Sequence, residues 1–538
     1  MDIKHNKYFS SFKPNDKFFG LGIENETYFV VGTKQVTGTE IINNRKRERY
    51  SVDYYTNFKA EELDKFFANI DENHIYNIPI FMNSYVMKNC DKNGNPKTLY
   101  DKAMTPNVKF SGQTLEDFLI EQNIILNDTY KKNFEYDGDA IEFITNNFYK
   151  TTVSDCVNEL IETKQVIIDE FNKVFKENNI YSTITFPEYN YGFAKYTTNM
   201  NNVSICNNST YHINITLPTL LDDNCDIKDM NKFIKNHKRA IKYIQWLEPL
   251  IIACYGSADI FSLYNDKFAK GSLRNALSRY ISIGTYNPES MKQGRLLNDF
   301  NHNNINNWYT EYHQQESGYI PPETIGYDIN FKNFRNHGIE IRFFDAFPEK
   351  YLADIINLII LVCELSLDKK NVSNRLVGTA VKTPFWHLQA KLCIKNGSKS
   401  ELNIDYVNYI AKLFNINNIK ISSCQDLLQI IANTLFDKYS KSKFASSISP
   451  NMSNPIMIDY NAQSIEFHRQ FLEKIIINDI ILPEIELNNN YIDVIAEFDE
   501  LSDLSKEIIP ISIQVNNQKK KKNKKKKNKK KNKKQRRR

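Results

Sequence analysis

Two short segments, more than three hundred residues apart, each predict a β-strand with two charged side chains on one face. The first segment carries Glu24 and Glu26, and the second carries Glu340 and Arg342. Side chains at positions i and i+2 of a strand project from the same face of its sheet. Carboxylates that share a face repel one another unless a cation lies between them. The usual cation is a hard divalent ion such as Mg²⁺, which prefers oxygen ligands and often binds together with nucleotide phosphates. An exposed strand with a polar face is the simpler alternative.

Two further segments have the same polarity. Tyr211–Ile215 places His212 and Asn214 on one face, and Ala140–Ile144 carries Glu142 as its only charge. A single histidine on a strand is usually a structural residue, but four strands of one polarity favour a shared polar cavity. Their apolar faces suit a sheet whose back is covered by helices. We therefore expect an α+β fold in which helices cover the outer face of a mainly antiparallel sheet.

In order and residue type these segments resemble the glutamate–cysteine ligases and the wider carboxylate–amine ligases, which share a glutamine-synthetase-like fold. The similarity spans about residues 18 to 366 and rests on five motifs that follow one another as in that family. The motifs are Gly22-x-Glu24-x-Glu26, Asp139-Ala140-Ile141-Glu142 with Thr145, His212-x-Asn214 with Leu217-Pro218, Ser272-Leu273-Arg274 with Ile283-Gly284-Thr285-Tyr286-Asn287, and Ile339-Glu340-Ile341-Arg342 with Asp345 and Phe347-Pro348.

The resemblance implies an ATP- and Mg²⁺-dependent ligase that joins an amino-acid-like carboxylate to an amine. ATP would phosphorylate the carboxylate, and the amine would then attack the acyl phosphate. Two or three Mg²⁺ ions would neutralise the phosphates. The implied metal ligands are Glu24, Glu26, Glu142, His212 and Glu340, and the implied nucleotide contacts are Arg342, His212 and Asn214.

Arginines would supply the remaining chemistry. Arg342 would meet the migrating phosphoryl group, because its planar guanidinium presents two parallel donors. Either Arg274 or Arg279 would bind the substrate carboxylate or phosphate. The choice stays open because the stretch from Arg274 to Gly284 looks longer than in the bacterial ligases. The second acidic strand is followed by Asn146 and Asn147 where family members often have prolines, and no residue identifies the amine substrate.

Composition places the protein inside the cell, in the cytoplasm or nucleus. The N-terminus lacks the apolar core of a secretory signal. The longest apolar run, residues 355–362, is far shorter than the roughly 18 residues of a membrane span, so no membrane association is expected.

The eight cysteines form no Cys-x-x-Cys pair, which argues against a zinc site or a disulfide framework. No phosphate-binding P-loop motif or dinucleotide-binding glycine fingerprint is present.

The net charge of +6 conceals two parts of opposite sign. Lys519–Arg538 holds 13 lysines, 3 arginines and no acidic residue, so the other 518 residues carry a net charge of −10. Such a polycation predicts a disordered tail that binds nucleic acid or another polyanion or serves as a nuclear-import address, and a solubilising end is the alternative. A second function class follows, a non-catalytic structural or nucleic-acid-binding protein on the same scaffold that acts through its tail.

Four regions are expected along the chain: a polar lead-in at 1–17, a ligase-like domain at 18–368, a mostly helical appendage at 369–515 and the basic tail at 516–538.

Thr152-x-x-Asp155 predicts the start of an amphipathic helix that ends near Glu177. Further helices are expected over about residues 228–255, ending at Gly256, and over about 349–367. Arg45-Lys46-Arg47 is interpreted as a solvated turn.

Overall fold

The computed structural model defines the sheet, the helices behind it and the helices of the C-terminal half. The residues that it describes are 13, 16–31, 36–42, 45–50, 81–82, 87, 113–122, 132–137, 140–178, 184–187, 193–195, 203–205, 209–258, 260–263, 269–276, 286–290, 292–293, 328–333, 338–417 and 420–475. Arg279, Gly284 and the basic tail lie outside these ranges.

A six-stranded sheet forms the centre of the structure, with the strand order β14-β15-β11-β1-β7-β6. Every neighbouring pair in it is antiparallel. The strands are β1 (Lys17–Thr27), β6 (Phe134–Asp137), β7 (Ala140–Ile144), β11 (Thr210–Leu220), β14 (Ile329–Asn333) and β15 (Gly338–Asp345). All four strand segments expected from the sequence belong to this sheet, which confirms the predicted α+β class.

The register aligns apolar residues of three strands on one face. Ile23 of β1 pairs with Ile213 of β11, which pairs with Ile341 of β15. All three side chains are fully buried. Because successive side chains alternate between faces, the neighbouring residues Glu24 and His212 face the opposite side. The sheet therefore has an apolar back and a polar front, as the alternating pattern predicted.

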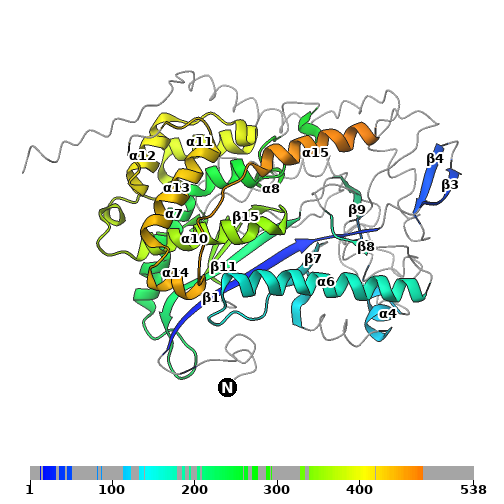
Figure 1. Cartoon of the computed structure of the whole chain (residues 1–538), viewed down its shortest axis with the longest axis horizontal. Coiled ribbons are helices and arrows are strands. Elements are labelled where there is room, and N and C mark those ends of the chain that lie inside the picture. The colour runs from blue at the N-terminus through cyan, green and yellow to red at the C-terminus, as the bar shows by residue number, and fades with distance from the viewer. Residues whose placement is uncertain are drawn as a thin grey trace, which may run out of the picture.

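Three long helices cover the apolar back of the sheet. Helix α6 (Val153–Glu177) lies against β1 and β7, α7 (Met230–Tyr255) lies against β11 and β15, and α10 (Leu352–Leu367) contacts both helices (Figure 1). The Thr152 hydroxyl accepts a hydrogen bond from the Asp155 amide at the start of α6, and Gly256 ends α7. A short 3-10 turn, η6 (Glu349–Tyr351), precedes α10. All three predicted helices are confirmed.

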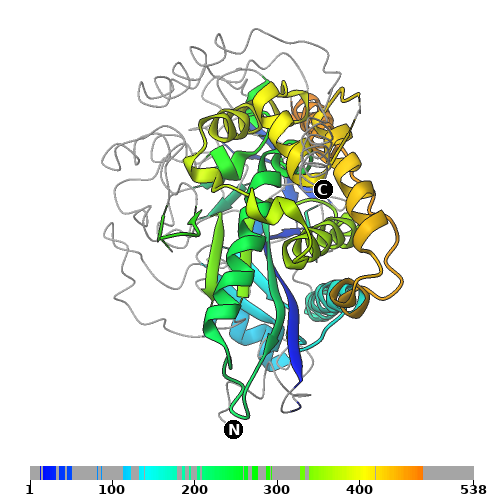
Figure 2. The same ribbon diagram turned by 90° about the vertical axis from the view of Figure 1, so that its left-hand side faces the viewer.

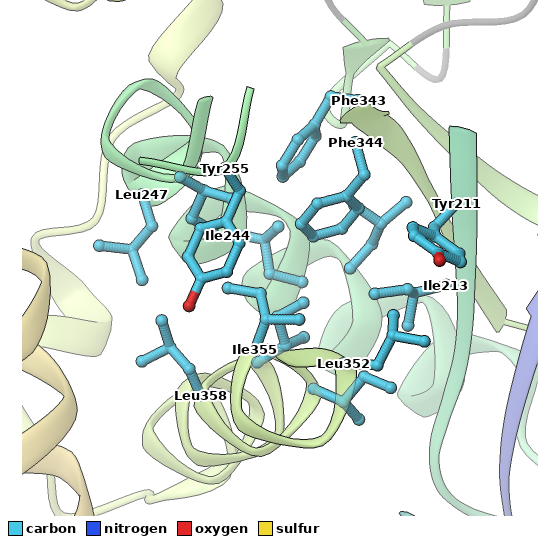
Figure 3. Close-up of a cluster of buried hydrophobic side chains, with 14 of the residues drawn as sticks. Tyr211, Ile213, Ile244, Leu247, Tyr255, Phe343, Phe344, Leu352, Ile355 and Leu358 are labelled. Atoms are coloured by element: carbon cyan, nitrogen blue, oxygen red, sulfur yellow. The ribbon is translucent and has the colours of Figure 1, made fainter. Parts of the chain in front are cut away.

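The core forms where α7 and α10 meet the back of β11 and β15. Figure 3 shows side chains from these four elements converging on one apolar volume. Its labelled members are Tyr211, Ile213, Ile244, Leu247, Tyr255, Phe343, Phe344, Leu352, Ile355 and Leu358, all of them buried. Burying apolar area at roughly 25 cal/mol per Å² is the main favourable term in such packing.

The helices that follow residue 368 gather beside α7 and α10 (Figure 2). Trp246 of α7 contacts the rings of Phe385, Tyr406 and Tyr409, with the Tyr409 ring centroid 4.2 Å away. These helices are α11 (Pro384–Asn396), α12 (Ile404–Phe414), α13 (Cys424–Tyr439), α14 (Lys443–Ile448) and α15 (Tyr460–Ile475). Their buried side chains belong to the same hydrophobic cluster as the sheet and α7. The core is therefore continuous across residue 368, where the division into two domains stays a prediction.

Shorter elements complete the described part of the chain. The remaining strands are β2 (Phe29–Val31), β3 (Val36–Ile42), β4 (Arg45–Tyr50), β5 (Phe81–Met82), β8 (Ile184–Thr185), β9 (Phe193–Lys195), β10 (Val203–Ile205), β12 (Tyr286–Asn287) and β13 (Lys292–Gln293). The remaining helices are α4 (Leu115–Gln122), α8 (Leu273–Asn275), η2 (Ile260–Leu263), η7 (Val372–Arg375), η8 (Ala380–Lys382) and η9 (Gly397–Lys399). Among the described helices, none combines the length and the apolar character needed to cross a bilayer.

One local prediction was wrong. Arg45-Lys46-Arg47 begins strand β4 instead of forming a turn, and it pairs with β3 in an antiparallel hairpin. The partners include Ile41 and Ile42, opposite Lys46 and Arg45. Charged residues are depleted in strands but are tolerated at sheet edges, and backbone pairing with a neighbouring strand outweighs that weak propensity.

Helix α7 is joined to β11 through a buried histidine. The Nε2 atom of His237 accepts a hydrogen bond of 3.0 Å from the Leu217 amide, and Nδ1 donates one of 2.8 Å to the Phe233 carbonyl. Burial lowers the pKa of His237 to about 4, because the charged form is poorly solvated there. The imidazole is therefore neutral in the folded protein at neutral pH.

This histidine predicts a loss of stability in acid. Above pH 6.5 His237 is neutral in both states and contributes nothing. As the pH falls from 6.5 towards 4 the unfolded chain takes up a proton that the folded chain does not. The free energy of unfolding should therefore fall by up to about 3 kcal/mol over that range. Urea titrations at pH 7, 5.5 and 4.5 measure this fall. His237→Gln should flatten it, and an equal slope in both proteins would contradict the assignment.

Candidate metal centre

Strands β1 and β11 bring the first ligand-type side chains together. Glu24 and His212 are cross-strand partners, and Glu24 Oε2 lies 3.2 Å from His212 Nδ1. The amide of Asn214, two residues along β11, donates a 3.1 Å hydrogen bond to Glu24 Oε1. All three side chains are buried, with at most 7% of each residue exposed. Both residues of the His212-x-Asn214 motif therefore hold the same carboxylate.

Strand β15 adds Glu340 from the other side of β11. Glu340 Oε1 lies 3.7 Å from His212 Nδ1, and the Arg342 guanidinium donates to the same oxygen. The second oxygen accepts a 3.0 Å hydrogen bond from Asn330 of β14. Ligand atoms of Glu24, His212 and Glu340 all lie within 4.8 Å of one another, close enough to share one metal ion.

Arg274 enters the centre from the short helix α8. Its Nε donates to the Arg342 carbonyl oxygen at 2.9 Å, and one terminal nitrogen lies 3.1 Å from His212 Nε2. The other terminal nitrogen lies 3.9 Å from Glu26 Oε2. The structure thus places Arg274 among the predicted ligands, whereas Arg279 lies outside the described residues.

The motif around Arg274 is held by an acidic residue at the end of β15. Ser272 begins α8, and its hydroxyl donates to Asp345. The other oxygen of Asp345 accepts the Arg274 backbone amide at 3.3 Å. Asn275 donates from its side chain to the Phe343 carbonyl. These bonds join the Ser-Leu-Arg segment to β15, the strand that carries Glu340 and Arg342.

The hydrogen bonds define the protonation of His212. A guanidinium only donates, so Nε2 accepts from Arg274 and the proton lies on Nδ1, where it is donated to Glu24. Burial, followed by the positive charges of Arg342 and Arg274, holds the pKa of His212 well below its ordinary value of 6.5. His212 is therefore neutral, which is the form that can bind a metal ion. An ion on Nδ1 would require the proton on Nε2, which lies 3.5 Å from Glu26 Oε1.

The two arginines differ in their surroundings. Burial lowers the pKa of Arg274, and the charge of Glu26 only partly opposes this effect. Burial also acts on Arg342, but the negative charges of Glu340 and Glu26 outweigh it and raise the pKa of Arg342. Both groups remain cationic at neutral pH, because the guanidinium pKa is far above 7. Two fixed cations therefore face the buried carboxylates.

Acidic residues on neighbouring strands form a row that runs from Glu26 towards the edge of the sheet. Glu26 pairs with Glu142 of β7, and Glu142 pairs with Glu135 of β6. Directly opposed residues have Cβ atoms about 5 Å apart, so Glu142 is a neighbour of Glu26 as the sequence predicted. Glu135 was not predicted. The same i, i+2 spacing identifies it, because Glu135 and Asp137 flank Tyr136 in a short strand.

The first motif requires glycine at position 22 for a steric reason. The Phe148 ring lies on the front of β1, and a Cβ atom at Gly22 would lie 2.8 Å from its Cδ2 atom. At Gly20 the corresponding contact would be 2.1 Å. Real Cβ atoms essentially never approach so closely, so only glycine fits under the ring. Phe148 thereby covers the apolar end of β1 next to the two glutamates.

Lys164 on the back of the sheet was also missed. Its ammonium group donates to Asn25 Oδ1 at 2.9 Å and pairs with Glu349. Asn25 in turn donates to the Thr210 carbonyl of β11 at 3.0 Å. Burial lowers the pKa of Lys164, and Glu349 opposes this effect. A lysine at an apolar position of an amphipathic helix was the available signal.

Comparison with known proteins identifies one relative over nearly the whole chain. The chain is 38% identical over 522 residues to the uncharacterized protein R704 of Acanthamoeba polyphaga mimivirus. The alignment covers 95% of this chain and 89% of that protein. No family model matches the sequence.

The geometry predicts that Glu24 and Glu340 are metal ligands. Glu24→Gln and Glu340→Gln should each weaken Mg²⁺ binding at least about tenfold. Even the loss of a residue that only hydrogen-bonds to a metal ligand lowers metal affinity by about 10- to 100-fold. The fold should persist because the amide keeps the shape of the side chain, but Glu340→Gln should lower the free energy of unfolding, because Arg342 loses its carboxylate partner. Titration calorimetry with Mg²⁺ measures the affinity. Glu177→Gln, at an exposed position of α6, is the control. If the three variants bind Mg²⁺ equally, the metal assignment is wrong.

Proposed function

This chain belongs to the family of the mimivirus protein R704, and we propose that it is an ATP- and Mg²⁺-dependent carboxylate–amine ligase. The observation that carries the proposal is the convergence of Glu24, His212 and Glu340 with two arginines on the polar front of one sheet. Anionic ligands suit a divalent cation, and guanidinium groups suit phosphate oxygens. A centre that holds both suits phosphoryl transfer from a metal-bound nucleotide.

The ligand set fits Mg²⁺. Carboxylate oxygens are hard ligands, and the neutral His212 ring adds one nitrogen. Asn214 Oδ1 is buried next to Glu24 and has no hydrogen-bond partner among the described residues. A buried acceptor without a donor costs about 1–3 kcal/mol, so a bound ion or its water would satisfy it. Mg²⁺ bound there would neutralise phosphate charge during the transfer.

The arginines supply the contacts that a migrating phosphoryl group requires. Arg342 is held by Glu340, and Arg274 is held by the Arg342 carbonyl and His212. Neither guanidinium needs to reorganise over a long distance, which is the condition for effective electrostatic stabilisation. An arginine that contacts the transferring phosphoryl group raises the rate by about 10³- to 10⁵-fold. Arg274, which also lies near Glu26, is suited to bind the substrate carboxylate or its phosphate.

The proposed reaction has two steps. A carboxylate oxygen of an amino-acid-like substrate attacks the γ-phosphorus of ATP, which forms an acyl phosphate and releases ADP. An amine nitrogen then attacks the acyl carbon, an amide bond forms and phosphate leaves. The five motifs in the order of the glutamate–cysteine ligases support this chemistry, and with it a glutamine-synthetase-like type of sheet. Asn214, together with His212 and Arg342, would contact the nucleotide.

The direct test is ADP release by the full chain with ATP, Mg²⁺ and pooled amino acids. We expect ADP and a new product whose mass equals the sum of two amino acids minus water. Glu340→Gln should form neither, whereas Glu177→Gln should match the wild type. Absence of ADP from the wild type with every amino acid mixture would refute the ligase proposal and favour a non-catalytic scaffold.

Replacing Arg342 by lysine separates transition-state from ground-state interactions. Lysine keeps the positive charge and loses the planar pair of donors. Arg342→Lys should lower kcat by about 10²-fold or more and change the KM for ATP by less than about threefold. Steady-state ADP formation measures both constants. An equal loss in kcat and ATP affinity would restrict Arg342 to binding, and an unchanged kcat would remove it from the chemistry.

We further propose that this protein is intracellular and that its basic tail attaches it to nucleic acid or another polyanion. The supporting observation is the run of 16 cationic residues in Lys519–Arg538 beside a body of net charge −10. Contacts of lysine and arginine with phosphates release counterions, so such binding weakens steeply with salt and is independent of base sequence.

Truncation after Gln518 should separate this attachment from catalysis. We expect the truncated protein to keep wild-type ADP release and to lose retention on immobilised DNA at low salt. Retention of the full chain should fall as salt rises from about 50 to 200 mM. Undiminished DNA retention after truncation would place the binding surface in the body of the protein.

A further inference from the structure

One side chain of the C-terminal helix α15 reaches the segment that carries Arg274. Asn461 is fully buried, and its amide nitrogen lies 3.0 Å from the Gly256 carbonyl oxygen, 2.8 Å from that of Lys270 and 3.0 Å from that of Gly271. Its oxygen accepts the Ser398 amide at 3.0 Å. A single NH₂ group thereby joins the end of α7 to the two residues before Ser272.

The backbone around Asn461 leaves this segment little freedom. The Gly271 amide donates to the Ile394 carbonyl at 2.9 Å, and the Leu273 amide donates to the Ser257 carbonyl at 2.8 Å. A Cβ atom at Gly271 would lie 1.9 Å from the Cys393 carbonyl oxygen. The segment is thus packed against the end of α11 with no room for a side chain, so a shift of its carbonyl groups must move the residues that follow.

Only a few bonds separate these carbonyls from the metal centre. Ser272 and the Arg274 amide are held by Asp345, and the Arg274 guanidinium extends from there to His212. Without the Asn461 amide, the three carbonyl groups that it contacts before the start of α8 would lose this hydrogen-bond donor. The direct contacts of Arg274 and the backbone bonds to Ile394 and Ser257 would remain, but the segment before α8 would lose the side chain that joins its carbonyl groups to the end of α7.

We propose that Asn461 is a positioning residue for Arg274, so that the helices after residue 368 help to build the active centre. The proposal rests on the ligase function in so far as Arg274 takes part in it. No motif marks Asn461, which lies in the region expected from the sequence to be an appendage. Its role follows from three carbonyl contacts on the segment that leads into the Ser-Leu-Arg motif.

The first experiment tests the structural step without reference to activity. Hydrogen–deuterium exchange of a peptide covering residues 269–276 is compared in the wild type, Asn461→Ala and Gln463→Ala. Gln463 is exposed on the same helix and provides the matched control. Asn461→Ala should raise exchange in this peptide by about tenfold, because amides of locally opened segments lose protection. Unchanged exchange in Asn461→Ala would overturn the proposal.

The second experiment links Asn461 to Arg274 by a double-mutant cycle. Mn²⁺ is the probe ion, and its affinity and the rate of ADP release are measured for Asn461→Ala, Arg274→Gln and the double variant. Removing the Arg274 cation next to the ligands should tighten Mn²⁺ binding by about tenfold and lower turnover by about 10²-fold. Asn461→Ala should change both quantities in the same directions. The double variant should equal Arg274→Gln alone, because residues that act as one unit are not additive.

General loosening of the fold gives a different result. It would weaken Mn²⁺ binding and turnover together, and its effects would add to those of Arg274→Gln; either finding would overturn the proposal. Asn461→Asp keeps the size of the side chain and serves if the alanine variant does not fold. At neutral pH its carboxylate cannot donate to the three carbonyls, so the same pattern is expected. If the wild type neither binds Mn²⁺ nor releases ADP, the ligase proposal fails, and the exchange experiment still decides whether Asn461 orders the segment.

Discussion

The structure depends on how buried carboxylates are compensated by partly buried cations. Glu340 is 2% exposed and Glu24 is 7% exposed, so water does little to screen their repulsion. Moving isolated charges out of water costs several kcal/mol for each ion unless partners satisfy them. Here the guanidinium groups of Arg342 and Arg274 lie among the acids. The strand register sets where the acids lie, and the start of α8 sets where Arg274 lies.

This compensation also links the arginines to any ion that binds. Glu340 Oε1 accepts a hydrogen bond from Arg342 and also lies 3.7 Å from His212 Nδ1. An ion shared by Glu340 and His212 would compete with Arg342 for that oxygen. It would also require the His212 proton on Nε2, which now accepts from Arg274. Metal binding would therefore release donors of both arginines, which could then face a phosphate.

Much of the sheet and of the centre could be predicted because a strand has a period of two. On each strand, that period puts Glu24, His212 or Glu340 on the face opposite to the adjacent isoleucines, and the apolar pattern indicates that the isoleucines face the helices. Helices α6 and α7 were predictable from the Thr152 cap and the Gly256 stop. The register of the strands could not be predicted, because bulges between Phe18 and Gly20 and between Tyr211 and Ile213 shift the pairing.

Residues whose role depends on distant backbone were missed. Asn461 contacts carbonyl groups about 190 to 205 residues away in sequence, and no local pattern encodes such a contact. The contact of Lys164 with Asn25 could not be predicted, because it is formed only once α6 lies on β1. The basic run from Arg45 to Arg47 predicts a solvated turn, whereas pairing with β3 decides its conformation. Tertiary context outweighs local propensity at each of these positions.

The continuous packing along α7 has a consequence for how this protein comes apart. One side of the helix contacts the central sheet, and Trp246 lies among Phe385, Tyr406 and Tyr409 on the other. Proteins open in cooperative units defined by shared contacts. We therefore expect the sheet and the C-terminal helices to unfold as one such unit under heat or denaturant. A proteolytic fragment ending near residue 368 would lack the three rings that cover Trp246 and would expose its indole to water.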